Sequence, residues 1–235
     1  MNILISGAGS GLGYETVRKL LTYADTRILA LSRTEENLQR LLEAEPEAVA
    51  VGRLQILAFD IIKSNYISSL APVLAEFMPQ PDILINNAGG LINKPFIDTN
   101  TDDFRQMMEV NFYGHLEMTH FILPYLNPQL AHIVNIGSMG AFQGSAKFKG
   151  LAAYSASKAA LMNFTECLAT ELNDQNIKVN GLALGSAQTD MLRKAFPGYE
   201  APLSAAEMAA FIADFALTGH RFFNGKIIPV ALLNV

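Results

Sequence analysis

Short apolar runs alternate with longer amphipathic segments along almost the whole of this 235-residue chain. The runs are continuous in Ile, Leu and Val, which is typical of parallel strands that are covered on both faces. They predict strands at Asn2–Ser6, Arg27–Ser32, Leu54–Asp60, Ile83–Asn86, His132–Gly137, Lys178–Leu184 and Lys226–Val230. The segments between them predict helices at Gly11–Tyr23, Thr34–Ala44, Tyr66–Phe77, Thr101–Leu126, Ala152–Asn173 and Ser204–Leu217.

Repeated strand–helix units of this spacing predict a doubly wound α/β fold, with a seven-stranded parallel sheet and helices on both faces. The chain contains no linker rich in Pro, Gly or Ser, no low-complexity stretch and no internal repeat. We therefore expect residues 1–235 to form a single domain.

The composition argues against some binding partners and indicates a cellular compartment. Half of the residues are hydrophobic and 17% are charged, which suits a globular core. A net charge of −5 without any run of Lys or Arg argues against nucleic-acid binding. No apolar stretch approaches the roughly 18 residues of a membrane span. Met1 leads almost directly into a predicted strand, without a secretion signal, so we expect a cytoplasmic protein that does not bind membranes.

Cysteine and histidine usage gives no sign of a metal centre. The only cysteine, Cys167, cannot form an internal disulfide, and we interpret it as a small buried residue of a helix. His115 and His120 are five residues apart, so they do not share a helix face and we expect no metal site there.

A glycine-rich turn, Gly7-Ala-Gly-Ser-Gly-Leu-Gly13, joins the first predicted strand to the first helix. Glycine permits positive φ and close approach of the backbone to a pyrophosphate, and a helix N-terminus presents free N–H groups to an anion. Such a turn also occurs as a simple tight connection, but its place at the first strand–helix junction favours nucleotide binding.

The end of the second strand indicates which nucleotide binds. NAD-specific sites carry an Asp or Glu there, to bind the ribose hydroxyls of the adenosine. This chain has Ser32 followed by Arg33, which suit a 2′-phosphate and favour NADP(H) over NAD(H). The alternative is that Arg33 is simply a solvated residue at the start of a helix.

Tyr154 and Lys158 stand four residues apart in Tyr-Ser-Ala-Ser-Lys, which places them on one face of a helix. A lysine cation about 6 Å away contributes roughly 2.8 kcal/mol toward lowering the pKa of a tyrosine, which is otherwise near 10. Tyr154 therefore has the neighbour that a tyrosine needs to act as a general acid or base. Ser138, just past the fifth strand, is placed to hydrogen-bond the oxygen of a substrate.

At this point the sequence resembles the short-chain dehydrogenase/reductase family over essentially its whole length. The resemblance rests on the cofactor loop from Ser6 to Gly13, on Asp60-Ile61, on Asn86-Asn87-Ala88-Gly89, on Asn111, and on Ser138, Tyr154 and Lys158. It implies a Rossmann fold and hydride transfer between a nicotinamide and a carbonyl or secondary alcohol. It also implies pairing of subunits, as a homodimer or homotetramer, through the two long helices at Thr101–Leu126 and Ala152–Asn173.

The resemblance further implies a role for each site residue. Tyr154 gives or takes the proton, Lys158 also grips the nicotinamide ribose, Ser138 positions the substrate, and Asn111 links Lys158 to solvent through a water. The cofactor-binding residues that it implies are Ser6, Gly7, Ser10, Gly11, Leu12, Gly13, Ser32, Arg33, Asp60, Ile61, Asn87, Ala88, Gly89, Tyr154, Lys158, Gly185 and Thr189.

Three features depart from the family pattern. Leu184 stands before Gly185 where the family has proline, which leaves nicotinamide positioning less assured. Residues 145–150 form an insertion that overhangs the substrate side, where Lys147 and Lys149 either favour an anionic substrate or, in our preferred interpretation, are solvated. The segment between Thr189 and Ser204, where the family has a substrate lid, is short and indicates an open site.

Two functions remain open from the sequence. The leading hypothesis is an NADP(H)-dependent carbonyl reductase or alcohol dehydrogenase that acts on a small or carrier-linked substrate. The alternative is a catalytically silent, cofactor-binding relative that acts as a regulator or scaffold, for which Leu184 and the short lid are the only support.

Overall fold

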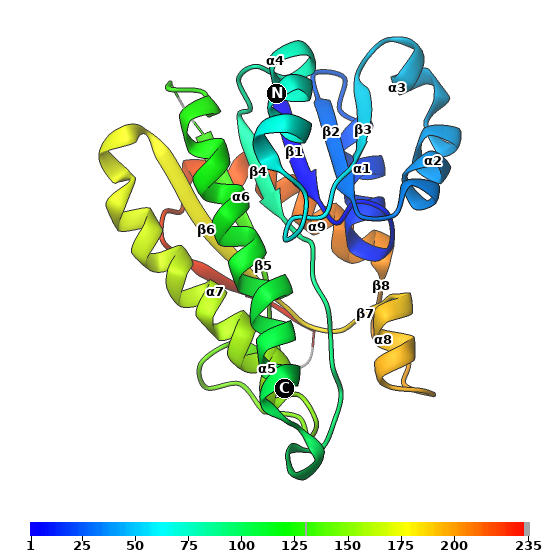
Figure 1. Ribbon diagram of the computed structural model, residues 1–235, viewed down its shortest axis with the longest axis vertical. Coiled ribbons are helices and arrows are strands. Elements are labelled where there is room, and N and C mark those ends of the chain that lie inside the picture. The colour runs from blue at the N-terminus through cyan, green and yellow to red at the C-terminus, as the bar shows by residue number, and fades with distance from the viewer. Residues whose placement is uncertain (130, 233–235) are drawn as a thin grey trace.

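The computed structural model describes residues 1–129 and 131–232, and its centre is one seven-stranded parallel sheet (Figure 1). The order of the strands across the sheet is β3-β2-β1-β4-β5-β6-β9, and every neighbouring pair is parallel. Their bounds are β1 Asn2–Ser6, β2 Arg27–Ser32, β3 Leu54–Ala58, β4 Ile83–Asn86, β5 Ala131–Ser138, β6 Ile177–Leu184 and β9 Ile227–Val230. The predicted doubly wound fold is confirmed.

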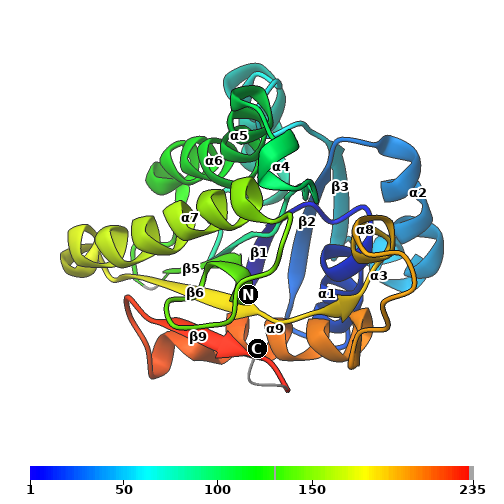
Figure 2. The ribbon, with the colours of Figure 1, turned by 90° about the horizontal axis from the view of Figure 1, so that it is seen from below.

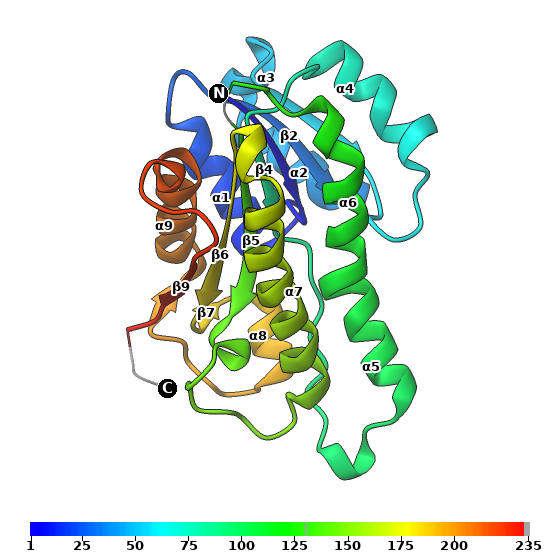
Figure 3. The same ribbon diagram turned by 90° about the vertical axis from the view of Figure 1, so that its left-hand side faces the viewer.

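Helices cover both faces of the sheet (Figures 2 and 3). One core lies between the sheet and α1, α2, α3 and α9, and contains Val17, Leu38 and Ile212. The other lies beneath α4, α6 and α7, and contains Leu74 and Met118. The helix bounds are α1 Gly11–Leu21, α2 Glu35–Ala44, α3 Pro46–Ala50, α4 Ala71–Phe77, α5 Thr101–Met108, α6 Gly114–Ile122, α7 Ala152–Glu171, α8 Asp190–Ala195 and α9 Ala205–Thr218.

The long helix that the sequence predicts at 101–126 is helical throughout but not uniformly α. A π-helical turn at Glu109–Tyr113 joins α5 to α6, and a 3₁₀ turn at Leu123–Tyr125 ends the rod. A second π turn at Tyr66–Leu70 precedes α4. π turns are found preferentially at functional sites, and the one in the long rod contains Asn111.

Short elements were missed because they hold too few residues to show a period. These are α3, α8, and a two-stranded parallel pair formed by β7 (Ala187–Gln188) and β8 (Leu203–Ser204). The interpretation of Cys167 as buried was wrong. Its thiol is exposed on α7, because Thr165, Leu168 and Ala169 are the residues of that turn that face the core.

The described residues contain neither a membrane-spanning helix nor a cluster of metal-ligating side chains. Within residues 1–129 and 131–232, no helix is both long and apolar enough to cross a lipid bilayer. Over the same part of the chain, no group of three or more His, Cys, Asp and Glu side chains is arranged to hold a metal ion.

A buried histidine links β5, β6 and α9. His132 contacts the carbonyl oxygen of Ala216 through Nδ1 at 2.9 Å and the side-chain nitrogen of Asn180 through Nε2 at 3.1 Å. Because a carbonyl only accepts, Nδ1 carries the hydrogen and Nε2 accepts from the amide of Asn180. Burial of the ring lowers the pKa of His132 to about 4.

Folding stability should therefore fall in acid. The pKa of His132 is ordinarily 6.5, so between pH 6.5 and about 4 the unfolded state binds a proton that the folded state does not. The contribution of His132 is complete above pH 6.5, falls as the pH is lowered, and is lost below about pH 4. Replacing His132 by Gln should flatten the pH dependence of the unfolding free energy by up to about 1.4 kcal/mol per pH unit in this window. Urea unfolding at several pH values measures this slope.

A matched control is His120→Gln, because His120 is exposed on α6 and its imidazole meets water in both states. Its unfolding free energy should follow the wild-type pH dependence. A His132→Gln protein with the wild-type slope would contradict the assignment.

Candidate functional site

A cleft of about 650 Å³ opens where the carboxyl ends of the central strands meet. It lies at the point where the strand order reverses, between β1 and β4, which is where ligands bind in open parallel sheets. Of the residues that the sequence predicts for the site, all but Ser6 and Asn111 line this cleft. Those two are fully buried behind its wall.

The glycine-rich turn forms the floor of one end of the cleft. Gly11 has a φ of +54°, which disfavours any residue with a Cβ atom. A Cβ atom at Gly13 would lie 2.2 Å from the carbonyl oxygen of Gly7, so only glycine fits there. Helix α1 begins at Gly11 and has no acidic residue in its first turn, so its free N–H groups are available to an anion. This cradle suits a pyrophosphate.

Ser6 ties the end of β1 to the loop that follows β4. Its Oγ atom accepts hydrogen bonds from the backbone nitrogens of Asn87 and Ala88, both at 3.1 Å. In return, the side-chain nitrogen of Asn87 donates to the carbonyl oxygens of Ser6 and Gly7, also at 3.1 Å. The two loops on either side of the switch point are thereby fixed to each other.

The far end of this half of the cleft is formed by Ser32, Arg33 and Asp60. Ser32 packs against the glycine turn, since a Cβ atom at Gly9 would lie 2.5 Å from its Oγ atom. Arg33 is exposed at the rim, and no acidic side chain of the described residues forms an ion pair with it. The carboxylate of Asp60 accepts from the backbone nitrogen of Ile62 at 2.9 Å and shapes the adjoining loop.

Tyr154 and Lys158 lie at the other end of the cleft, on the first two turns of α7. Lys158 is 4% exposed, and its Nζ atom donates to the carbonyl oxygen of Ile136 at 2.8 Å. Ser138 ends β5, and its Oγ atom accepts from the backbone nitrogen of Gly140 at 3.2 Å. The structure thus brings the three residues to one end of the cleft.

Burial is the largest influence on the pKa values of Tyr154 and Lys158 at this end of the cleft. It raises the pKa of Tyr154, and the neighbouring Ser138 side chain opposes that change. It also lowers the pKa of Lys158 to about 8. The pKa of Tyr154 therefore moves in the direction opposite to the one that the sequence predicts from the Lys158 charge, because removal from water has the largest effect. Tyr154 is therefore held as a neutral acid.

A family model described as short chain dehydrogenase matches residues 1–200. The chain belongs to the short-chain dehydrogenase/reductase family. It is 30% identical over 228 residues to an uncharacterized oxidoreductase of Staphylococcus epidermidis, covering 97% of this chain and 95% of that one. It is 29% identical over 217 residues to a protein of Acinetobacter baylyi named fatty acyl-CoA reductase, covering 91% of this chain and 72% of that one.

The fold of a solved relative agrees closely. A short-chain dehydrogenase from Shigella flexneri, described as complexed with NADP, superposes with a TM-score of 0.84 at 25% identity, covering 97% of this chain and 95% of that chain. Two further curated relatives are longer, and the chain spans 64% and 58% of their lengths.

In this short-chain dehydrogenase/reductase, Asn111 is a structural bridge. Its amide accepts from the nitrogen of Gly90 at 2.9 Å and donates to the carbonyl oxygen of Gly90 and to Ser157 Oγ, each at 3.0 Å. Ser157 in turn donates to the carbonyl oxygen of Tyr154 at 2.7 Å. Asn111 therefore couples the loop after β4 to the first turn of α7. The proton-relay role that the resemblance implies for it stays a prediction.

Sequence reasoning missed His115, which lies one helical turn after Asn111. Its Nε2 atom contacts the carbonyl oxygen of Ala88 at 2.7 Å, and the ring is completely buried. Burial, together with the nearby charge of Lys158, lowers the pKa of His115 to about 3, so the neutral ring donates from Nε2 and holds the loop. The spacing from Asn111 was the available signal, because residues four apart share a helix face.

The departure at Leu184 leaves the strand intact. Leu184 is the last residue of β6 and pairs with Ser138 of β5 and Val230 of β9. Gly185 continues this side of the cleft, and its nitrogen donates to the carbonyl oxygen of Val230 at 2.8 Å. Thr189 caps α8 through its Oγ1 atom, and its methyl group faces Gly11. The nicotinamide side of the cleft is therefore built without proline.

The lid is short but held at several points. The Ser186 hydroxyl contacts the Tyr199 hydroxyl at 2.9 Å, and the nitrogen of Ala201 donates to Gln188 at 2.7 Å. The carbonyl oxygen of Ala195, at the end of α8, accepts from the side chain of Asn93 at 2.7 Å. Helix α8 is thus bound to the segment that follows β4.

Residues 145–150 are the segment predicted to overhang the substrate side, and Phe148 is the residue of this segment that lines the cleft. That a substrate lies there stays a prediction. Lys147 and Lys149 are exposed and do not line it. The Lys147 ammonium donates to the carbonyl oxygen of Phe142 and to Ser145 Oγ, both at 2.6 Å. The preferred interpretation, that these lysines are solvated, agrees with their exposure.

Removal of the Ser6 hydroxyl should destabilise the fold. Ser6→Ala leaves the partly buried nitrogens of Asn87 and Ala88 without their partner, so we expect a loss of about 1–3 kcal/mol in the unfolding free energy, measured by urea titration. Ser10→Ala is the matched control, because Ser10 is exposed and its side chain makes no capping bond. Equal stability of the two variants would show that Ser6 does not hold the loops together.

Proposed function

We propose that this protein is an NADP(H)-dependent oxidoreductase that transfers a hydride between the nicotinamide and a carbonyl or secondary alcohol, with Tyr154 as general acid and base. The observation that carries the proposal is the placement of Tyr154, Lys158 and Ser138 together at one end of a glycine-floored cleft. The bound nicotinamide supplies the hydride and, when oxidised, a positive charge. All proton handling falls to residues of the chain.

Tyr154 is suited to donate a proton in the direction of carbonyl reduction. Its pKa is raised by burial, so the phenol stays protonated at neutral pH and has a proton to give. As negative charge develops on the substrate oxygen, Ser138 Oγ is placed to donate a second hydrogen bond to it. The protonation state of Tyr154 in the free protein is therefore the one that carbonyl reduction requires.

Lys158 stabilises the tyrosinate that remains after proton donation. Its ammonium is buried four residues along the same helix and already donates to the carbonyl oxygen of Ile136. A pKa of about 8 keeps it mostly charged at neutral pH, and its remaining hydrogens are free for a ribose hydroxyl. We assign Asn111 the task of holding the first turn of α7 against the loop after β4, through Ser157.

The residues at the adenosine end favour NADP(H). Ser32 ends β2 in the position where a carboxylate would bind the ribose hydroxyls, and Arg33 follows it at the exposed rim. A guanidinium forms paired hydrogen bonds with a phosphate, whereas a carboxylate would repel it. The solved relative described as complexed with NADP supports the same choice.

The substrate is proposed to be a small or carrier-linked carbonyl compound. The Acinetobacter relative that is named a fatty acyl-CoA reductase supports a carbonyl at the level of an aldehyde or thioester carbon. Within the described residues, neither lysine of the insertion lines the cleft, so its own walls offer no cationic site for an anionic substrate beyond Lys158 and Arg33.

Tyr154→Phe should abolish reduction. The substitution removes the proton donor and little binding surface, so turnover should fall by at least about 100-fold while the dissociation constant for NADPH changes by less than about threefold. NADPH oxidation over a panel of carbonyl compounds gives the first quantity, and fluorescence titration gives the second. Ser155→Ala, on the next residue of the same helix, is the control and should retain activity. Substantial turnover by Tyr154→Phe would remove Tyr154 from the mechanism.

Arg33→Ala should weaken NADPH selectively. Loss of the charge-assisted bonds to the 2′-phosphate should raise the NADPH dissociation constant by about tenfold or more and leave that for NADH within about twofold. Arg40→Ala serves as the control, because Arg40 is exposed on α2 and does not line the cleft. Equal losses for the two nucleotides would show that Arg33 does not contact the 2′-phosphate.

A further inference from the structure

Phe148 lines two cavities. One is the cleft that contains Tyr154, and the other, of about 410 Å³, lies beyond the insertion. Leu151 also lines both. Phe148 and Leu151 therefore border the cleft and the outer cavity at once.

Apolar and aromatic side chains line part of the cleft that contains Tyr154. Leu91, Met139, Phe196 and Tyr199 are among its lining residues, together with Phe148 and Leu151. The outer cavity continues with Pro95, Phe96 and Ala152, and Phe96 is 72% exposed. Lys147 and Lys149 also line this outer cavity. Apolar side chains are therefore present on both sides of Phe148, with two lysines beside them on the outer side.

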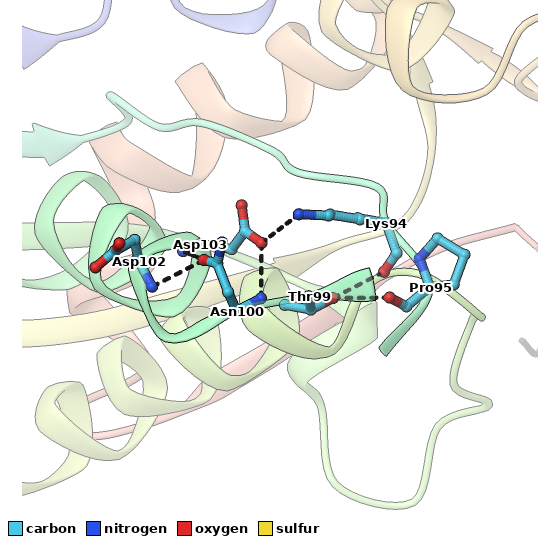
Figure 4. A network of polar contacts seen from close by, with 6 residues as sticks. All are labelled: Lys94, Pro95, Thr99, Asn100, Asp102 and Asp103. Carbon is cyan, nitrogen blue, oxygen red and sulfur yellow. Dashed lines mark hydrogen bonds and ion pairs between the residues drawn. The ribbon is translucent and has the colours of Figure 1, made fainter. Parts of the chain in front are cut away.

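The far wall of the outer cavity is fixed by a polar network (Figure 4). Thr99 Oγ1 donates to the carbonyl oxygen of Pro95 at 2.9 Å, and the Lys94 ammonium pairs with Asp103 at 2.8 Å. Asp103 also accepts from the nitrogen of Asn100, whose side chain caps α5. Pro95 and Phe96 are held in place at the start of α5.

The insertion is bound to the same segment. The nitrogen of Lys94 donates to the carbonyl oxygen of Gly150 at 2.9 Å. Gly150 has a φ of +85°, and a Cβ atom there would lie 1.9 Å from the side-chain oxygen of Asn93. Because Asn93 also binds the end of α8, one segment fixes the lid, the insertion and the outer cavity together. Phe148 therefore lies on a loop with fixed anchors, and the residue is 46% exposed.

We propose that the substrate carries an unbranched aliphatic chain on its carbonyl carbon, and that Phe148 is the specificity-determining residue that limits the length of this chain. The inference rests on the proposed function for the position of the carbonyl at Tyr154. From there the chain extends along Leu91, Met139 and Leu151 and ends against the ring of Phe148. Removing the ring joins the two cavities, so a longer chain gains apolar surface to cover.

The test is a chain-length series, from 2-butanone to 2-dodecanone, with NADPH and the wild-type, Phe148→Ala and Phe148→Trp proteins. In the wild type, kcat/KM should rise by up to about fourfold per methylene and then stop rising where the chain meets Phe148. In Phe148→Ala the rise should continue to longer ketones, improving the longest by about tenfold or more while the shortest stays within about twofold. Phe148→Trp should move the limit to a shorter chain.

Ile97→Ala is the matched control, because Ile97 is 91% exposed beside Phe96 but lines neither cavity. Its chain-length profile should equal that of the wild type. Calorimetric binding of the corresponding 1-alkanols, measured without turnover, gives a second profile for the same proteins. A shifted binding profile without reduction of any ketone would support the inference and contradict the proposed function. Identical profiles for the wild type and Phe148→Ala in both measurements would overturn the inference.

Discussion

The site depends first on how closely two backbone turns approach each other. A Cβ atom at Gly7 would lie 2.6 Å from the Cα atom of Ala88, so the turn after β1 and the loop after β4 touch through main-chain atoms. The strands that lead into them pair in register, with Ile3 beside Ile83 and Ile5 beside Ile85. Adjacent strands are about 4.8 Å apart, which leaves no room for a side chain between the turns that continue them. The floor of the cleft is therefore a consequence of sheet pairing and glycine together.

Burial then decides the charges at the chemical end. It raises the pKa of Tyr154 and lowers those of Lys158 and His115, so each group is shifted toward its neutral form. His115 is neutral as a result and can serve as a hydrogen-bond donor to Ala88 without adding a second cation beside Lys158. The charge of Lys158 persists in part because its ammonium has a carbonyl partner at Ile136. The same removal from water that opposes ionisation of Tyr154 keeps its proton available to a substrate.

The sequence was sufficient for those parts of the fold that repeat a simple pattern. The bounds of β1, β2 and β4 follow from uninterrupted apolar runs, and both faces of the sheet are covered as such runs require. The sequence did not predict contacts in which a residue of one element holds a distant loop. The four-residue spacing places Asn111 and His115 on one helix face, but it does not identify their partners. Gly90 and Ala88 lie on a loop 21 or more residues away in the chain. The direction of the Tyr154 pKa was missed for a similar reason, because its burial is set by neighbours that spacing along α7 does not specify.

The substrate end was the least predictable because it is assembled from segments without regular structure. Asn93 binds the carbonyl oxygen of Ala195, 102 positions away in the sequence, and the nitrogen of Lys94 binds the carbonyl oxygen of Gly150. The segment after β4 therefore positions both the lid and residues 145–150, and this segment has no periodic pattern in the sequence. The sequence interpretation weighed Lys147 and Lys149 because charge is conspicuous in a sequence, yet the side chain of that loop that enters the cleft is Phe148 between them. Which side chain of this loop faces the cleft is set by the hydrogen bonds that hold the loop, and no pattern of charge in the sequence reveals it. For this reason the chemistry of the site follows from its motif residues, whereas its choice of substrate follows from the anchored loops around them.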